Sequence, residues 1–394
     1  MSGPYDYVPP EYWYLDNNKF GGAYGFNMET SPGPAIPSAS SMRKTLPKAS
    51  RWPIDDNWNY HAGMGKFAQY DIFNSAMSVS LGVAENLDNY SRKAQLMTYD
   101  GERAMFEAYG ANKYNSTGVI QWMLSNAWPS FIWHLYDYYF VPGGGYSGTR
   151  KANEPLHVQY RYDDRRVVVV NSTPKAYRNL RIDERLVDHS GKLLYRHNYS
   201  LNVPPDSITA AFSPSGARSL GTKSDWIPQI GFTSFLKLEI CDVAGSVLSD
   251  NFYVVLKKLA DLQWDKSNYF YTPANSYADL RDLEEMPKAE VCATFEWEPT
   301  ATGGVIHISN GGKRVAFFLH ATAVKPGSNE EIAPVLWSDN FISLLPGESR
   351  ELSFELSKLT RDRVAVKLEG WNIASRNVIA KSASKTIVAI RERR

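Results

Sequence analysis

The pattern of the sequence changes at a glycine-rich stretch, residues 143–155, and this change restricts the chain to a fold that combines two kinds of domain. Before it, a buried strand at 21–29, a long helix from 86 to about 111 and a β-branched strand at 117–125 are expected. Strand, helix and strand in succession are typical of a parallel sheet covered by helices. After it, short alternating runs separated by Gly, Asn and Pro predict antiparallel β-sandwiches.

We therefore expect four segments. Residues 1–155 form an α/β unit, 156–262 a β-sandwich, 263–288 a polar linker and 289–394 a second β-sandwich. The first segment holds only two clear strands, whereas a complete (β/α)₈ barrel takes about 250 residues. It is thus either a small α/β domain of another kind or the last part of a barrel.

Composition excludes several classes of function. Forty-three basic and 42 acidic residues leave a net charge of +1, and no basic cluster predicts a nucleic-acid or membrane-surface partner. No apolar run approaches the roughly 20 residues of a membrane span, and the N-terminus lacks the features of a signal peptide. The two cysteines, Cys241 and Cys292, are expected to be buried thiols. No metal site or cofactor is expected.

Aromatic residues are concentrated in the α/β segment. Residues 1–155 contain six of the 11 Trp and 15 of the 24 Tyr. Aromatic rings stack on the apolar faces of sugars, and Tyr and Trp add a polar group to that contact. The alternative is that these rings fill a large core.

A single acid, Glu29, ends the first expected strand and is followed by the rigid turn "TSPGPAIP". The carboxyl end of a parallel strand is where α/β barrels place catalytic groups. The alternative is a Glu that caps a turn or pairs with an Arg. Trp122, Asn126 and Trp128 lie at or just past the end of the second strand, and the tryptophans could equally be core residues.

Several segments resemble glycoside hydrolase family 2, in particular its exo-β-D-glucosaminidase branch near the β-mannosidases. They run from residue 3 to about 350 and include "GPYDYVPPEYW", "GGAYGFNMETSPGPAIP", "NWNYHAG", "RKAQLMTYDGERAMFEAY", "GVIQWMLSNAWPSFIWHLYDYYF", "KANEPLHVQY" and "APVLWSDNFISLLPGES". The resemblance implies the last part of a (β/α)₈ TIM barrel, carrying strands 7 and 8, followed by two immunoglobulin-like β-sandwiches.

The resemblance also implies a retaining hydrolase that removes terminal β-linked glucosamine from chitosan-like oligosaccharides. It makes Glu29 the nucleophile, Trp122 the residue that stacks against the sugar, and Asn126 and Trp128 neighbours of the sugar pocket. A β-mannosidase or β-galactosidase of the same family remains an alternative, as does a non-catalytic carbohydrate-binding fragment. Asp137 either helps to bind the cationic amino sugar or has a structural role.

The acid/base of this family lies on barrel strand 4, well before the nucleophile, and we do not expect it in this chain. Two Asn-Glu pairs have a suitable composition, Asn153–Glu154 and Asn329–Glu330. The first follows strand 8 and the second lies in the last sandwich, so neither can occupy the position on strand 4. We therefore expect the C-terminal part of a longer enzyme, inactive alone, whose partners are a carbohydrate and the missing N-terminal part. Enzymes of this type are often exported, so a secreted or periplasmic parent is the expectation.

Overall fold

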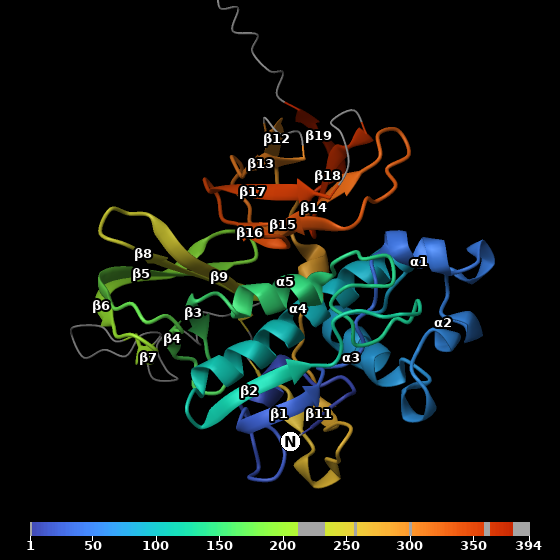
Figure 1. Ribbon diagram of the computed structural model, residues 1–394, viewed down its shortest axis with the longest axis horizontal. Coiled ribbons are helices and arrows are strands. Elements are labelled where there is room, and N and C mark those ends of the chain that lie inside the picture. Colours follow the sequence, from blue (N-terminus) through green and yellow to red (C-terminus); the bar gives the residue numbers. More distant parts are fainter. Residues whose placement is uncertain (1, 212–232, 256–257, 299–301, 358–362, 381–394) are drawn as a thin grey trace, which may run out of the picture.

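The computed structural model describes residues 2–211, 233–255, 258–298, 302–357 and 363–380 (Figure 1). Parts of both expected sandwich segments, 156–262 and 289–394, therefore lie outside the described residues.

The α/β part contains a pair of parallel strands, β1 (Gly25–Thr30) and β2 (Ser116–Gln121). Strand β1 begins later than expected because Gly21 and Gly22 have φ values of +81° and +72°, a turn conformation that interrupts an extended chain. Strand β2 ends at Gln121, before the expected limit of 125.

Helices connect these strands and extend beyond them. The long helix expected from 86 is confirmed as α4 (Leu87–Ala111), and the side chain of Asn86 caps its N-terminus by accepting from the Asn89 amide. In the described part of the chain the other α-helices are α1 (Ala39–Thr45), α2 (Asp56–Tyr60), α3 (Asp71–Leu81) and α5 (Gly144–Ala152). Short 3₁₀ turns lie at η1 (Pro10–Trp13), η2 (Lys48–Ser50), η3 (Gly65–Phe67), η5 (Trp264–Lys266) and η6 (Arg281–Glu285).

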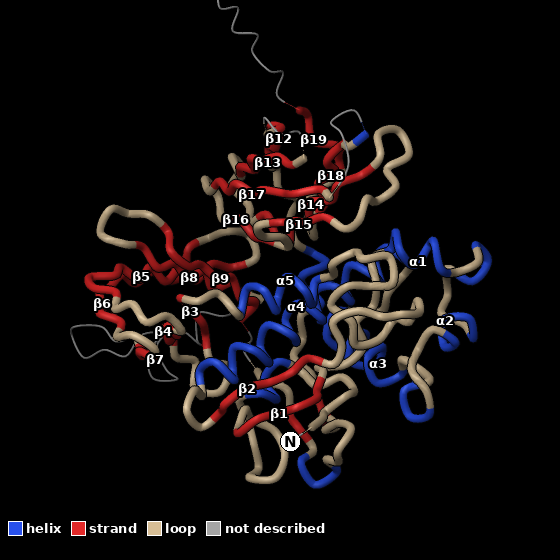
Figure 2. The backbone as a smooth tube through the Cα atoms, in the orientation of Figure 1, coloured by secondary structure: helices blue, strands red, loops and turns tan. Residues whose placement is uncertain are grey.

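Two antiparallel sheets form the first sandwich, with strand orders β3-β4-β7 and β6-β5-β8-β9. Figure 2 shows these strands gathered on one side of the helices. The strands are β3 (Leu156–Tyr160), β4 (Val167–Asn171), β5 (Tyr177–Asp188), β6 (Leu193–Val203), β7 (Ser207–Ala210), β8 (Ser234–Cys241) and β9 (Val247–Val255).

The C-terminal unit is hydrogen-bonded in the order β15-β17-β13-β12-β19-β18-β14-β16. A short parallel contact between β12 and β19 joins its two antiparallel halves. The strands are β12 (Cys292–Trp297), β13 (Gly303–Ser309), β14 (Ala316–Val324), β15 (Val335–Trp337), β16 (Ile342–Leu344), β17 (Ser349–Leu356), β18 (Ala365–Glu369) and β19 (Arg376–Ala380). Cys241 is buried as expected, but Cys292, the first residue of β12, is exposed rather than buried.

The segment 263–288 has more structure than a polar linker requires. Strands β10 (Asp261–Leu262) and β11 (Ala274–Ser276) pair antiparallel and close the chain between them into an arm. In Figure 1 this gold segment lies beside β1 and the N-terminus. The arm therefore packs against the α/β part rather than extending freely between the sandwiches.

Helix α4 lies at the centre of the packing. Its C-terminal half, with Met105 and Ala108, shares one apolar core with the first sandwich residues Ile182 and Leu238. Its N-terminal half belongs to a second core that includes α3 and Phe317 of the C-terminal unit. Helix α4 thus joins the three parts of the chain through shared apolar cores, although the C-terminal unit also has a core of its own.

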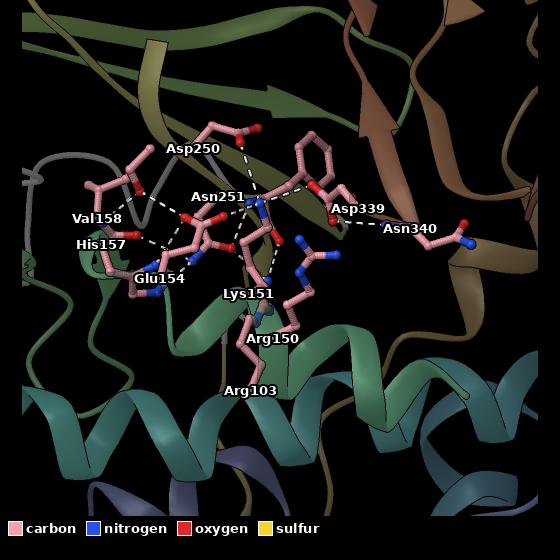
Figure 3. A network of polar contacts seen from close by, with 12 residues as sticks. Arg103, Arg150, Lys151, Glu154, His157, Val158, Asp250, Asn251, Asp339 and Asn340 are labelled. Atoms are coloured by element: carbon pink, nitrogen blue, oxygen red, sulfur yellow. Dashed lines mark hydrogen bonds and ion pairs between the residues drawn. The ribbon is translucent and has the colours of Figure 1, made fainter. Parts of the chain in front are cut away.

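A network of buried charges joins the same three parts (Figure 3). The Nζ of Lys151, on α5, lies 3.5 Å from Asp250 of β9 and 3.0 Å from Asp339 of the C-terminal unit. Burial opposes ionisation of Asp250, but the cationic groups of Lys237, Lys151 and Arg350 outweigh it and hold its pKa well below the usual range. Asp250 therefore stays ionised although it is buried, because cationic side chains from the first sandwich, from α5 and from the C-terminal unit surround it.

Helices α4 and α5 approach each other closely through glycines. A Cβ added to Gly144 or Gly148 would lie 2.3 Å from a backbone carbonyl oxygen of α4, that of Gln95 or Tyr99. The contact therefore depends on the absence of side chains at these two positions, which are one helical turn apart.

We expect Gly148→Ala to lower the free energy of unfolding by about 1–3 kcal/mol, because the helices must separate to admit the methyl group. Gly110→Ala is the matched control on α4, since its Cβ would meet only Val170 at 3.9 Å. That change should stabilise the helix by about 0.5–1 kcal/mol. Urea unfolding of both variants checks the pair, and equal effects would contradict close packing at Gly148.

Candidate active site

Glu29 is the last but one residue of β1 and is half-buried. Its carbonyl oxygen accepts a hydrogen bond from the Gly3 amide at 2.7 Å, and its own amide donates to the Asn27 side chain at 3.3 Å. Beside it, the Trp122 amide donates to the carbonyl of Thr30 at 2.9 Å. The ends of β1 and β2 are therefore held side by side, and the backbone of Glu29 is held by Gly3 and Asn27.

The hydroxyl of Tyr5 donates to Oε1 of Glu29 at 2.6 Å. Burial, followed by the hydrogen bond to Glu29, raises the pKa of Tyr5, so the phenol stays protonated and able to donate. Its backbone is held in turn by Trp133, whose Nε1 donates to the Tyr5 carbonyl at 2.6 Å. Sequence reasoning did not single out Tyr5, although it lies within the segment "GPYDYVPPEYW" that carries the family resemblance.

The two tryptophans expected at the site are not core residues. Trp122 is 37% exposed and Trp128 is 41% exposed. Trp128 stacks on His61, with ring centroids 5.2 Å apart and planes at 18°, and meets Tyr60 edge-on. This packing fixes the plane of the Trp128 ring while leaving part of it accessible, as a stacking platform requires.

Asn126 is tied to a buried histidine. Its Nδ2 lies 2.8 Å from Nδ1 of His134, and because an amide nitrogen can only donate, this nitrogen of His134 is the acceptor. Burial lowers the pKa of His134 to about 3, so the ring is neutral at ordinary pH. Asn126 therefore supports the loop after β2 through this contact.

The other acids considered in the sequence have partners away from Glu29. Asp137 is buried and its Oδ1 accepts from the amides of Tyr139 and Val141, which favours the structural alternative for this residue. Glu154 pairs with Lys151 at 2.9 Å, and Glu330 pairs with Lys325 at 2.7 Å.

One face of the β1–β2 pair exposes large apolar side chains. Phe26, Met28 and Ile120 are 47%, 60% and 51% exposed, whereas Val119 packs on the core shared with α4. Among the described residues these two strands form a sheet of their own. Soluble proteins rarely leave such a surface and such strand edges uncovered.

Within the described part of the chain, no cluster of three or more His, Cys, Asp or Glu side chains could hold a metal ion. No helix in that part has the length and apolar character needed to cross a membrane.

Several known proteins are similar to this chain in sequence or in fold. The family model described as the exo-β-D-glucosaminidase Ig-fold domain matches residues 269–373. An exo-β-D-glucosaminidase from Streptomyces avermitilis is 36% identical over 96% of this chain and 43% of its own length. The crystal structure of the exo-chitosanase CsxA from Amycolatopsis orientalis matches with a TM-score of 0.86 at 32% identity, covering 96% of this chain and 46% of that one. A mannosylglycoprotein endo-β-mannosidase from Lilium longiflorum is 27% identical over 94% of this chain and 44% of its own length.

The chain is thus similar to glycoside hydrolases over nearly all of its own length. Relatives that are 30–36% identical to it are exo-β-D-glucosaminidases, which confirms the resemblance seen in the motifs. The chain spans less than half the length of these curated relatives.

We expect acid to destabilise the protein partly through His134. Its pKa of about 3 in the folded state lies below the unfolded value of about 6.5, so the unfolded state binds the extra proton between these limits. Stability should fall as pH drops below about 6.5, by up to about 1.4 kcal/mol per pH unit from this group. Unfolding of wild type and His134→Gln at several pH values measures the contribution. Their stability difference should be constant above pH 7.5 and shrink in acid, and a constant difference throughout would contradict the assignment.

Proposed function

We propose that this chain carries the nucleophile of a retaining β-glycosidase that removes terminal β-linked glucosamine from chitosan-like oligosaccharides. The observation that carries the proposal is Glu29, half-buried at the end of β1 and hydrogen-bonded by Tyr5. The relationship to exo-β-D-glucosaminidases supports this substrate class. A structure of the Amycolatopsis exo-chitosanase in complex with PNP-β-D-glucosamine supports it further.

In the proposed reaction, the Glu29 carboxylate attacks the anomeric carbon and the bond to the leaving oxygen breaks while a second carboxylic acid protonates that oxygen. Water then releases the sugar from the glycosyl-enzyme. Tyr5 occupies Oε1 of Glu29 and thereby leaves Oε2 to form the new bond. The hydrogen bond fixes the rotation of the carboxylate, which is the positioning that a nucleophile needs.

The exposed faces of Trp122 and Trp128 would hold the sugar beside this carboxylate. Both rings are accessible, and aromatic stacking suits the apolar face of a pyranose. Asn126 would contribute indirectly, because its bond to His134 holds the loop that carries Trp128.

We further propose that β1 and β2 are the last two strands of a (β/α)₈ barrel. Its other strands and the acid/base would come from sequence outside these 394 residues. The exposed face with Phe26, Met28 and Ile120 suits strands of this kind, and the relatives are about twice as long. Retaining enzymes place the second carboxyl about 5–5.5 Å from the nucleophile. Glu154 and Glu330 are paired with lysines of their own surroundings, so we expect little hydrolysis by this chain alone.

A β-mannoside is the second candidate substrate, because the lily endo-β-mannosidase is also a relative, at 27% identity. A panel of aryl β-glucosaminide, β-mannoside and β-galactoside, assayed with an enzyme that contains this chain, separates the candidates. A purely carbohydrate-binding role would instead leave sugar binding intact and show no turnover of any of the three.

We expect Glu29→Gln to lower kcat of such an enzyme by about 10³-fold or more, because the amide cannot form the glycosyl-enzyme. Glu330→Gln is the matched control, since Glu330 pairs with Lys325 on the surface, away from Glu29, and its loss should leave the rate within twofold. Steady-state kinetics on an aryl β-glucosaminide checks both variants. Wild-type turnover by Glu29→Gln would exclude Glu29 as the nucleophile.

A further inference from the structure

The arm formed by residues 261–276 has a defined tip. Its base is closed by the β10–β11 pairing and by a bond from the Gln263 amide to the Pro273 carbonyl at 2.8 Å. At the tip, the side-chain oxygen of Asn268 accepts from the Phe270 amide at 2.8 Å. These bonds hold Tyr269 and Phe270 in a fixed turn, because an Asn side chain that accepts from the amide two residues later forms an Asx turn.

This tip is docked on the chain just before the first strand. The carbonyl of Phe270 accepts from the amides of Tyr5 and Asp6, at 2.7 and 3.1 Å. The Phe270 ring packs edge-on against Phe67, with centroids 5.7 Å apart. The approach is so close that a Cβ at Gly3 would lie 2.3 Å from the Tyr269 carbonyl oxygen.

Side chains continue this contact to the carboxylate. The hydroxyls of Ser2 and Tyr269 are 2.7 Å apart, those of Tyr269 and Tyr5 are 3.0 Å apart, and Tyr5 reaches Glu29 at 2.6 Å. Each phenol has one proton to donate. Because the proton of the Tyr5 hydroxyl is used in the hydrogen bond to the carboxylate, Tyr269 must donate to Tyr5, and Ser2 must then donate to Tyr269. The chain of bonds thus has a single direction, toward Glu29.

We propose that Tyr269 is a positioning residue for Glu29, and that it acts by donating a hydrogen bond to Tyr5. The arm before the C-terminal sandwich thereby becomes part of the support of the active-site carboxylate. The catalytic consequence rests on the function proposed above, whereas the coupling of Tyr269 to Glu29 does not.

The physical reason lies in the polarisation of linked hydrogen bonds. A phenol that accepts a hydrogen bond becomes a better donor, by perhaps 10–30% per bond. The Tyr269 hydroxyl therefore strengthens the bond from Tyr5 to Glu29, and that bond stabilises the carboxylate in its ionised form. Removing either hydroxyl should make the carboxylate easier to protonate.

The test follows the carboxyl ¹³C resonance of Glu29 against pH in the 394-residue chain carrying single hydroxyl deletions. Tyr5→Phe should move the midpoint up by about one pH unit, and Tyr269→Phe by about 0.3. The double variant should match Tyr5→Phe alone, because Tyr269 acts through Tyr5. Tyr114→Phe is the matched control, since its hydroxyl bonds to Asp206 instead and should leave the midpoint unchanged.

Two results would overturn the proposal. One is a midpoint for Tyr269→Phe equal to that of wild type. The other is an effect of Tyr269→Phe that persists in full when Tyr5 is already Phe. In an active enzyme, the acidic limb of kcat/KM should move to higher pH in the same order as the midpoints. If the titration midpoint of Glu29 shifts but the acidic limb of the kcat/KM profile does not, the coupling of Tyr269 to Glu29 is upheld. That result would count against Glu29 as the nucleophile.

Discussion

The burial of most of helix α4 beyond its first turn is the constraint on which the rest of the structure depends. Where a helix is covered by other elements, its polar side chains must find partners in those elements. Arg103 of α4 is fully buried, and its guanidinium donates to the Asn251 side chain and the Phe252 carbonyl of β9 while lying over the Tyr253 ring. The first sandwich thus supplies the hydrogen-bond partners that this buried guanidinium requires.

The same helix positions both strands of the candidate site. At its C-terminal end, the Asn112 side chain donates to the carbonyl of Ala23 just before β1, and the Ser116 hydroxyl at the start of β2 donates to the carbonyl of Tyr109. The nucleophile proposed for β1 and the tryptophans after β2 therefore share one rigid support. Sites held on such elements keep their geometry better than sites carried by loops.

Local pattern was sufficient to predict part of this arrangement. The Asn/Asp capping candidates and the absence of Pro indicated α4, although Gly101 weakened that pattern. The acid at the end of an apolar strand made Glu29 the candidate for the site. Contacts between distant segments could not be predicted. Tyr269 lies 264 residues from Tyr5 within a polar segment that has the composition of a linker, and its docking depends on the backbone of Phe270 rather than on a side-chain motif. The contact of Asn126 with buried His134 depends on the path of an irregular loop, and such a path cannot be predicted from hydrophobic periodicity.

The most direct test is to trap the covalent intermediate in an enzyme that contains this chain. A 5-fluoro-β-D-glucosaminyl fluoride suits the purpose, because fluoride leaves without a proton donor and the remaining fluorine slows release of the sugar. Mass spectrometry of the digested protein then locates the bound sugar. The account expects the added mass on the peptide that contains Glu29, at that residue. A label on a different carboxylate, with Glu29 unmodified, would contradict it.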